Sequence, residues 1–163
     1  MQKINAAWVL GLLLSAAAFA KTSDMKEPIH VDAARTEGSI KEQTLVYSGG
    51  VSVKQGSLEI KAEKLTVDRS AGEGKEVFIA QGSPATYSQV LDGDKPIQAS
   101  AEEIRYNVAN RTLTLTGKAE ITQSGSLVQS AKIEYNIEKQ QLSADSGKET
   151  ERVITIFTPE GIK

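Results

Sequence analysis

The sequence contains no cysteine and a single histidine, His30, and these scarcities exclude several kinds of site. Without cysteine there is no disulfide framework, and no acylated cysteine of the kind that anchors a lipoprotein. One histidine without a second cannot complete a zinc site. His30 alternates with Ile29 and Val31, so a solvent-facing strand residue is favoured over a ligand or a base. We expect no metal site and no cofactor.

Groupings of residues typical of catalysis are also lacking. The acidic pairs Glu102-Glu103 and Asp92-x-Asp94 lack the spacing of a calcium loop and any partner that would mark a glycosidase. Gly72 to Lys75 is too short for a phosphate-binding loop. We expect no catalytic residue and no enzymatic activity. The alternative, an extracytoplasmic enzyme built on stacked β-repeats, would need a nucleophile and base, or a carboxylate cluster, at matching strand positions.

Aromatic residues make up only 5% of the chain, and the net charge is −2. The aromatic side chains are scattered, and no stripe of basic residues accompanies them, so no stacking platform for single-stranded nucleic acid is expected. A slightly acidic surface does not attract a polyphosphate backbone. We therefore expect no nucleic-acid partner.

Residues 1–20 have the layout of a signal peptide. Lys3 precedes an apolar run of thirteen residues, Ala6 to Ala18, and Ala18-Phe19-Ala20 supplies a small-x-small cleavage site. Thirteen residues are too few to span a bilayer core of roughly 30 Å. We expect cleavage before Lys21 and a mature chain free in the periplasm; an uncleaved N-terminal anchor is the alternative.

From Ile29 onward, apolar and polar residues alternate in short bursts. Clear examples are Leu58/Ile60/Ala62, Ile97/Ala99/Ala101 and Ile104/Tyr106/Val108. Period two indicates strands with one buried face. Glycine-containing turns separate the bursts, and no stretch after Lys21 has a helical apolar stripe over more than two turns. The pattern predicts an all-β protein of about sixteen short strands.

Two parts of the chain resemble each other. LVYSGGVSVKQGSLEIKA from Leu45 aligns with LTLTGKAEITQSGSLVQSA from Leu113 when one insertion at Ser124 is allowed. Such similarity predicts stacked β-repeats. Because each repeat presents its aliphatic residues on the same face, stacking predicts a continuous apolar trough between two sheets.

Five segments of the chain stand out by their order and spacing: PIHVDA from Pro28, the stretch from Tyr47 to Arg69, GKEV from Gly74, GSPATY from Gly82 and GDKPI from Gly93. Together they resemble the OstA-like family of periplasmic lipopolysaccharide-transport proteins. The resemblance implies a twisted antiparallel β-jellyroll of two sheets, open at both ends, over residues 28–158. A flexible stretch, residues 21–27, would precede it, and a tail, residues 159–163, would follow.

The resemblance also implies the cargo and the partners. The cargo would be lipopolysaccharide, held by its lipid A portion, and energy would come from an inner-membrane ATP-driven exporter. The N-terminal edge would meet the membrane-anchored jellyroll component of that exporter. The C-terminal edge would meet the N-terminal jellyroll domain of the outer-membrane translocon, and copies of the chain would stack head to tail.

Candidate residues follow for both roles. By resemblance, the lipid would contact Ile29, Val31, Tyr87, Tyr106 and Val108; plain core packing is the alternative for each. An open sheet leaves unpaired backbone groups on its outer strands, where a partner strand can add. These edge strands would comprise Ile29, His30, Val31 and Asp32 at one end, and Val153, Ile154, Thr155, Ile156 and Phe157 at the other. Ordinary edge strands, or a self-assembling structural β-module without lipid cargo, are the alternatives.

Overall fold

A computed structural model describes residues 24–148 and 150–159, so the expected signal peptide, residues 1–20, lies outside the described residues. The chain begins with a short 3₁₀ helix, η1 (Asp24–Lys26), and continues as strands. The strands are β1 (His30–Asp32), β2 (Arg35–Ser39), β3 (Thr44–Gln55), β4 (Leu58–Asp68), β5 (Val77–Leu91), β6 (Lys95–Asn107), β7 (Thr112–Gln123), β8 (Ser126–Asn136), β9 (Gln141–Asp145) and β10 (Ile154–Phe157). No helix in these described ranges is long and apolar enough to cross a membrane.

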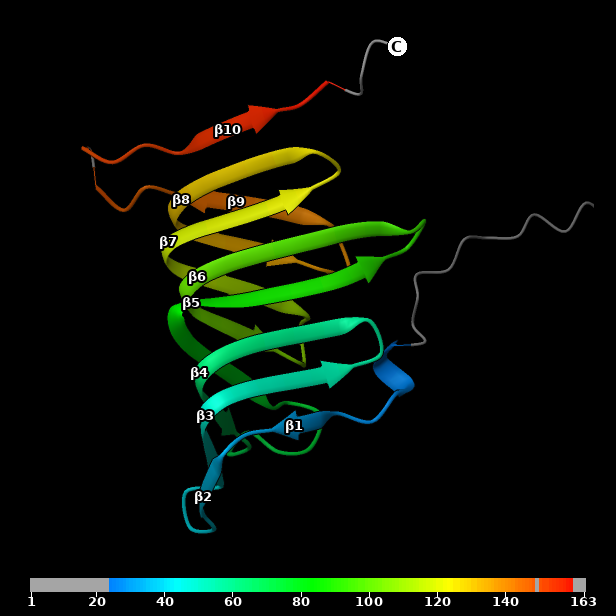
Figure 1. The fold of residues 1–163 in the computed structure, drawn as a ribbon, viewed down its shortest axis with the longest axis vertical. Helices are drawn as coiled ribbons and strands as arrows, with labels where there is room; N and C mark the ends of the chain where they lie inside the picture. Colours follow the sequence, from blue (N-terminus) through cyan, green and yellow to red (C-terminus); the bar gives the residue numbers. More distant parts are fainter. Residues whose placement is uncertain (1–23, 149, 160–163) are drawn as a thin grey trace, which may run out of the picture.

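The ten strands form one antiparallel sheet in which the six long strands, β3 to β8, follow one another as hairpins. Two short strands complete each end of the sheet: β1 and β2 both pair with β3, and β9 and β10 both pair with β8. Figure 1 shows this ladder with β1 and β2 at one end and β10 at the other. Neighbours in sequence are therefore neighbours in the sheet.

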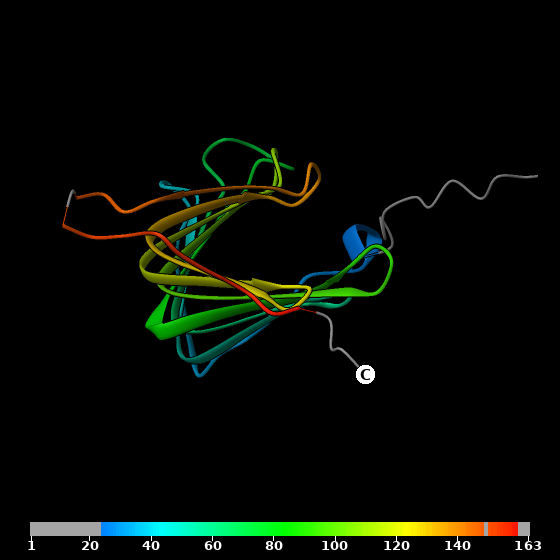
Figure 2. The same cartoon turned by 90° about the horizontal axis from the view of Figure 1, so that it is seen from above.

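Each long strand bends near its middle. The pairing register shifts in all five pairs of long strands, between Ser48 and Val51 in β3, for example, and between Thr116 and Ala119 in β7. Register shifts of this kind mark β-bulges, in which extra residues in one strand bend it. Because the bulges lie side by side, the sheet folds over itself into two layers that are joined at the bends and open on the opposite side (Figure 2).

We name the layers by their short strands. The β1/β10 layer contains β1, β10 and the halves of the long strands that pair with them. The β2/β9 layer contains β2, β9 and the other halves. The open side opposite the bends is called the mouth. At the mouth, the β1/β10 layer ends in the turns β3–β4, β5–β6 and β7–β8.

The all-β jellyroll expected from the sequence is confirmed, but the strand count differs. Sixteen is the number obtained when each of the six bent strands is counted as two halves beside the four short strands. In β4 the inward positions change from even numbers, Leu58 and Ile60, to odd numbers, Leu65 and Val67. This change of phase at the bulge looks like a strand boundary in sequence. For the same reason, the expected two sheets are two layers of one continuous sheet.

Gly117 shows why a bend needs a particular residue. Its φ of +83° is unfavourable for a residue with a Cβ. A Cβ at this position would lie 2.4 Å from Glu102 Oε2 and 2.9 Å from Glu102 Cβ on the neighbouring strand. Close approach of β6 and β7 at the bend therefore depends on the absence of a side chain.

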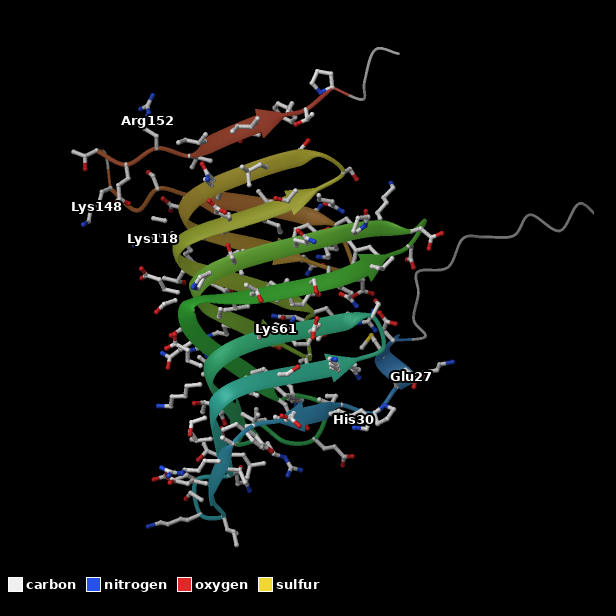
Figure 3. The ribbon with its side chains drawn as sticks, in the orientation of Figure 1. Glu27, His30, Lys61, Lys118, Lys148 and Arg152 are labelled. Carbon is white, nitrogen blue, oxygen red and sulfur yellow. The ribbon has the colours of Figure 1, made fainter. Side chains whose placement is uncertain are left out.

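The core lies between the layers, and one inward-facing row of each layer runs along its middle. In the β1/β10 layer, the register joins Val31, Val53, Ile60, Tyr87, Ala99, Ile121, Val128 and Thr155. In the β2/β9 layer, it joins Thr36, Tyr47, Leu65, Ala80, Ile104, Leu115, Ile133 and Ala144. The central members of both rows are buried, whereas the outward positions carry charged side chains such as Lys61 and Glu59, 3.6 Å apart (Figure 3).

Replacing Leu115 with alanine tests the importance of the central rows. Leu115 is 0% exposed, so the change leaves a cavity and should lower the free energy of unfolding by about 2–5 kcal/mol. Leu142→Ala is the matched control, because Leu142 is 41% exposed at the end of the sheet and should lose far less. Urea unfolding of both variants measures the difference; equal losses would contradict a packed centre.

Candidate functional site

The candidate site is the apolar interior between the two layers, which is called the groove below. Tyr87 belongs to the row in the β1/β10 layer, and Tyr106 faces it from the β2/β9 layer, beside Phe78 and Leu113 in the register. The Phe78 and Tyr106 rings are 6.4 Å apart between centroids, an ordinary aromatic contact. The groove thus has aliphatic walls with a cluster of aromatic rings at its centre.

The five residues expected to contact lipid occupy three kinds of position. Tyr87 and Tyr106 are buried between the layers, and Val31 and Val108 are partly buried against the same core. Ile29 lies just before β1 and is 44% exposed. Val31 and Tyr87 share one row, Tyr106 lies on the facing wall, and Ile29 and Val108 lie toward the mouth. Contact with lipid at these positions remains a prediction.

The groove is filled at its centre and open at both ends. At the β9/β10 end, a hollow of about 360 Å³ is lined by Ile121, Gln123, Val128 and Leu142, among others. At the β2 end, a hollow of about 520 Å³ is lined by Ile40, Leu45, Arg69 and others, all from the β2/β9 layer and its turns. Between them, side chains such as Leu65, Leu113 and Ile133 are 0% exposed. The two ends offer apolar surface, whereas the middle is closed by side-chain packing.

Polar side chains border the mouth on the β1/β10 layer. Gln89 and Gln123 lie in register with Ile97 between them, and the same row continues to Ser126 and Phe157. The Tyr87 hydroxyl donates a hydrogen bond to Gln89 Oε1, and the Tyr135 hydroxyl donates one of 3.4 Å to Gln123 Oε1. The glutamines therefore satisfy the two buried phenols and give the apolar groove a polar border.

The Tyr135–Gln123 bond is the single side-chain hydrogen bond that joins the layers away from the bends, within the residues that the structure describes. Elsewhere the layers meet through apolar side chains, whose contacts have no preferred direction. The bends hold the layers covalently on one side. Separating the layers at the mouth would therefore break few polar contacts.

Burial affects the ionisation of the central tyrosines. Loss of hydration raises the pKa of Tyr87 well above 10, and the nearby Tyr106, Tyr135 and Asp24 raise it further. Burial also raises the pKa of Tyr106, opposed by Arg111, and that of Tyr135, opposed by its hydrogen bond to Gln123. All three phenols are neutral at physiological pH, which is consistent with an apolar interior.

The expected edge strands lie at the two ends of the sheet. β1 (His30–Asp32) pairs only with β3, and β10 (Ile154–Phe157) pairs only with β8, among the described residues. Ile154, Ile156 and Phe157 are exposed, with Phe157 at 76%. Residues 21–27, expected to be flexible, include η1, in which Asp24 is buried. Use of either edge by a partner remains a prediction.

Sequence reasoning missed the polar border of the mouth. Gln55, Gln89 and Gln123 recur every 34 residues and stand close to the ends of β3, β5 and β7. This spacing was a usable signal, because inward-facing glutamines interrupt an otherwise apolar alternation. Asp24 gave no such signal, since a lone carboxylate before the first strand has no visible partner in the sequence.

These features define a class: a folded-over antiparallel β-jellyroll with an apolar interior, a continuous row of inward residues and an open edge at each end. The family described as LptA/(LptD N-terminal domain) LPS transport protein matches residues 30–141. The chain belongs to this family, as the resemblance to OstA-like proteins indicated.

Relatives and a solved structure agree with this assignment. The lipopolysaccharide export system protein LptA of Escherichia coli K12 is 35% identical over 93% of this chain and 82% of its own length. LptA of Haemophilus influenzae is 34% identical over 93% and 89%. The crystal structure of LptH from Pseudomonas aeruginosa, a periplasmic component of the lipopolysaccharide transport device, superimposes with a TM-score of 0.76 at 28% identity. It covers 84% of this chain and 99% of LptH.

The buried tyrosines predict how stability depends on alkaline pH. Burial keeps Tyr87 protonated above pH 10, whereas tyrosine in the unfolded chain ionises there. The stabilisation is therefore fully present below pH 10 and is lost as the pH rises above it. Tyr87→Phe should reduce this loss by about 1.4 kcal/mol per pH unit in that window.

Urea unfolding between pH 9 and pH 11 measures this effect. Tyr47→Phe is the control, because Tyr47 is only partly buried, in the strand β3 near the end of the sheet. The same pH dependence in wild type and Tyr87→Phe would contradict a buried, neutral Tyr87.

Proposed function

We propose that this chain is a periplasmic carrier that shields the acyl chains of lipopolysaccharide in the groove between its layers. The observation that carries the proposal is the row of inward residues that runs without interruption from β1 to β10 and ends in an open edge at each end. Membership of a lipopolysaccharide-transport family supports the choice of cargo.

The physical reason for such a groove is the cost of exposing acyl chains to water. Burial of acyl chain is worth about 0.8 kcal/mol per CH₂, so a chain of a dozen carbons costs on the order of 10 kcal/mol to expose. Aliphatic walls replace that contact without directional bonds. The free energy is then similar at each point along the row, so net movement depends on loading at one end by an energised partner.

Loading requires the two layers to separate, because the centre of the groove is filled by side chains in this structure. The bends act as the fixed side, and the mouth is the side where few polar contacts must break. The open hollows at the β2 and β9/β10 ends are the places where an acyl chain first finds apolar surface. Entry of an acyl chain then replaces contacts between the layers with contacts to the cargo.

The edges supply the proposed bridge between membranes. β1 and β2 would accept a strand from the inner-membrane anchored jellyroll component of an ATP-driven exporter. β9 and β10 would accept one from the N-terminal jellyroll domain of the outer-membrane translocon, and copies of this chain would join head to tail. Strand addition at these edges would extend each inward row into the next jellyroll.

The filled centre of the groove also favours a second candidate, a structural β-module that assembles through its edges and carries no lipid. Mass spectrometry of the protein purified from its native envelope discriminates between the two. Co-purifying lipopolysaccharide supports the carrier. Assembly into filaments with no lipid at any stage supports the structural module.

Carboxylates placed on the inner face of β1 test the lipid path. Changing both Ile29 and Val31 to Asp should lower capture of labelled lipopolysaccharide roughly tenfold, because charged groups are costly beside acyl chains. Both side chains lie toward the end of the sheet, so the loss of stability should be smaller. His30→Asp is the control, since His30 is exposed on the opposite face of the same strand. Equal losses of capture and stability would leave these residues only a packing role.

A proline at Thr155 tests the C-terminal edge. The Thr158 N–H donates to Gly125 O, and alternation along β10 therefore directs the Thr155 N–H away from β8, toward the free edge. Thr155→Pro should remove one bond available to a partner strand and abolish self-association, while keeping β10 paired with β8. Light scattering measures assembly, and Thr155→Val is the control that retains the N–H. Filaments of Thr155→Pro as long as those of wild type would refute this edge.

A further inference from the structure

The residues just before β1 lie across the mouth of the groove. η1 (Asp24–Lys26) contacts the β3–β4 turn, on the side of the molecule opposite the bends (Figures 1 and 2). Asp24 is only 7% exposed, although Met25, Lys26 and Glu27 after it are all exposed. A buried carboxylate in an otherwise exposed segment indicates a specific binding site for that side chain, which is called the seat below.

The seat is built from residues of two hairpins, β3–β4 and β5–β6. The Asp24 Oδ2 atom accepts hydrogen bonds from Ser57 Oγ and, at 3.2 Å, from Gln89 Nε2. Ser57 also binds the second hairpin directly, since its Oγ accepts from the Val90 N–H at 3.2 Å. One residue beyond η1, the Glu27 carbonyl accepts from Gln55 Nε2 at 3.1 Å. Two of the recurring glutamines thus hold this segment by their amides.

Gly56 makes room for the carboxylate. A Cβ at this position would lie 2.3 Å from Asp24 Oδ1 and 2.8 Å from Asp24 Cα, which no real packing allows. Its φ of +58° also suits glycine. The β3–β4 turn is therefore shaped to receive Asp24 at this point.

The seat is connected to the interior of the groove. Gln89, which donates to Asp24, accepts a hydrogen bond from the buried Tyr87 hydroxyl. Gln89 also lies in register with Ile97 on the inner face. Residues 24–27 consequently cover the part of the mouth that leads to the row containing Tyr87. Figure 3 shows Glu27 near the β3–β4 turn, with His30 farther along the chain at the start of β1.

We propose that residues 24–27 are a latch that closes this part of the mouth in the unloaded protein and leaves its seat when lipid enters. The inference rests on the proposed lipid-carrying function. Release exposes the Asp24 carboxylate to water and frees Ser57, Gln55 and Gln89, so the closed and open forms exchange protein hydrogen bonds for hydrogen bonds with water. The apparent affinity for lipid is then reduced by the fraction of molecules that are open.

A disulfide across the seat tests the latch. The chain has no cysteine, so the double variant Asp24→Cys with Ser57→Cys holds the only thiols, at two side chains that are in contact. Oxidation should lower the capture of fluorescently labelled lipopolysaccharide at least about tenfold. The apparent affinity is proportional to the fraction of open molecules, and a tenfold loss means that the disulfide lowers this fraction to about one-tenth or less of its value in the reduced form. Reduction of the same sample should restore capture to at least the wild-type level, because the reduced variant also lacks the bonds of the Asp24 carboxylate.

A second experiment weakens the latch by removing the Asp24 carboxylate. Asp24→Ala should increase the apparent affinity for the same labelled lipopolysaccharide several-fold, because the latch loses its hydrogen bonds to Ser57 and Gln89. Glu27→Ala is the matched control. It removes the same charge from the same segment, but Glu27 contributes only its backbone carbonyl to the seat. Glu27→Ala should bind as wild type does.

The outcomes separate the latch from the carrier function. Equal capture by the oxidised and reduced forms, or equal affinity of Asp24→Ala and Glu27→Ala, overturns the latch while the carrier function stands. A reduced form that stays impaired beside a competent wild type also overturns it. If wild type and every variant capture no lipid, the carrier function fails, and the latch fails with it.

Discussion

The bends at the middle of the six long strands are the constraint on which the rest of this structure depends. A single antiparallel sheet with one apolar face must cover that face, and no helix of the described residues does so. Bulges at the same level in every pair of long strands fold the apolar face onto itself. The core, the groove and the mouth all result from that one fold, and the close approach at Gly117 shows how little space it leaves.

Folding a sheet onto itself in this way leaves its two ends uncovered. A closed barrel would pair its first and last strands, whereas this sheet keeps them apart by its whole width. Exposed apolar side chains accordingly gather at the ends, at Ile29 near β1 and at Ile154, Ile156 and Phe157 in β10. The same architecture that buries the centre therefore provides both apolar entry points and sites for strand addition, and the two proposed activities share one structural cause.

Much of the fold was predictable from the sequence, because alternation of apolar and polar residues reports which face of a strand is buried. It correctly placed Ile60, Tyr87, Ile104 and Ile121 on the inside. It could not distinguish a bulge from a turn, since both interrupt the alternation, and so the bent strands were counted in halves. The polar mouth was less predictable. The contacts of Asp24 with Ser57 and Gln89 join residues 33 and 65 positions apart, and hydrogen bonds of that range leave no local pattern.

The 34-residue interval of Gln55, Gln89 and Gln123 is shared by the bends, where Gly50, Pro84 and Lys118 recur with the same spacing. One interval contains two strands, which add roughly 9–10 Å to the width of a sheet. The molecule is therefore modular in length. Duplication or loss of one such interval would lengthen or shorten the distance between its ends in steps of that size, without altering the cross-section that any cargo would meet.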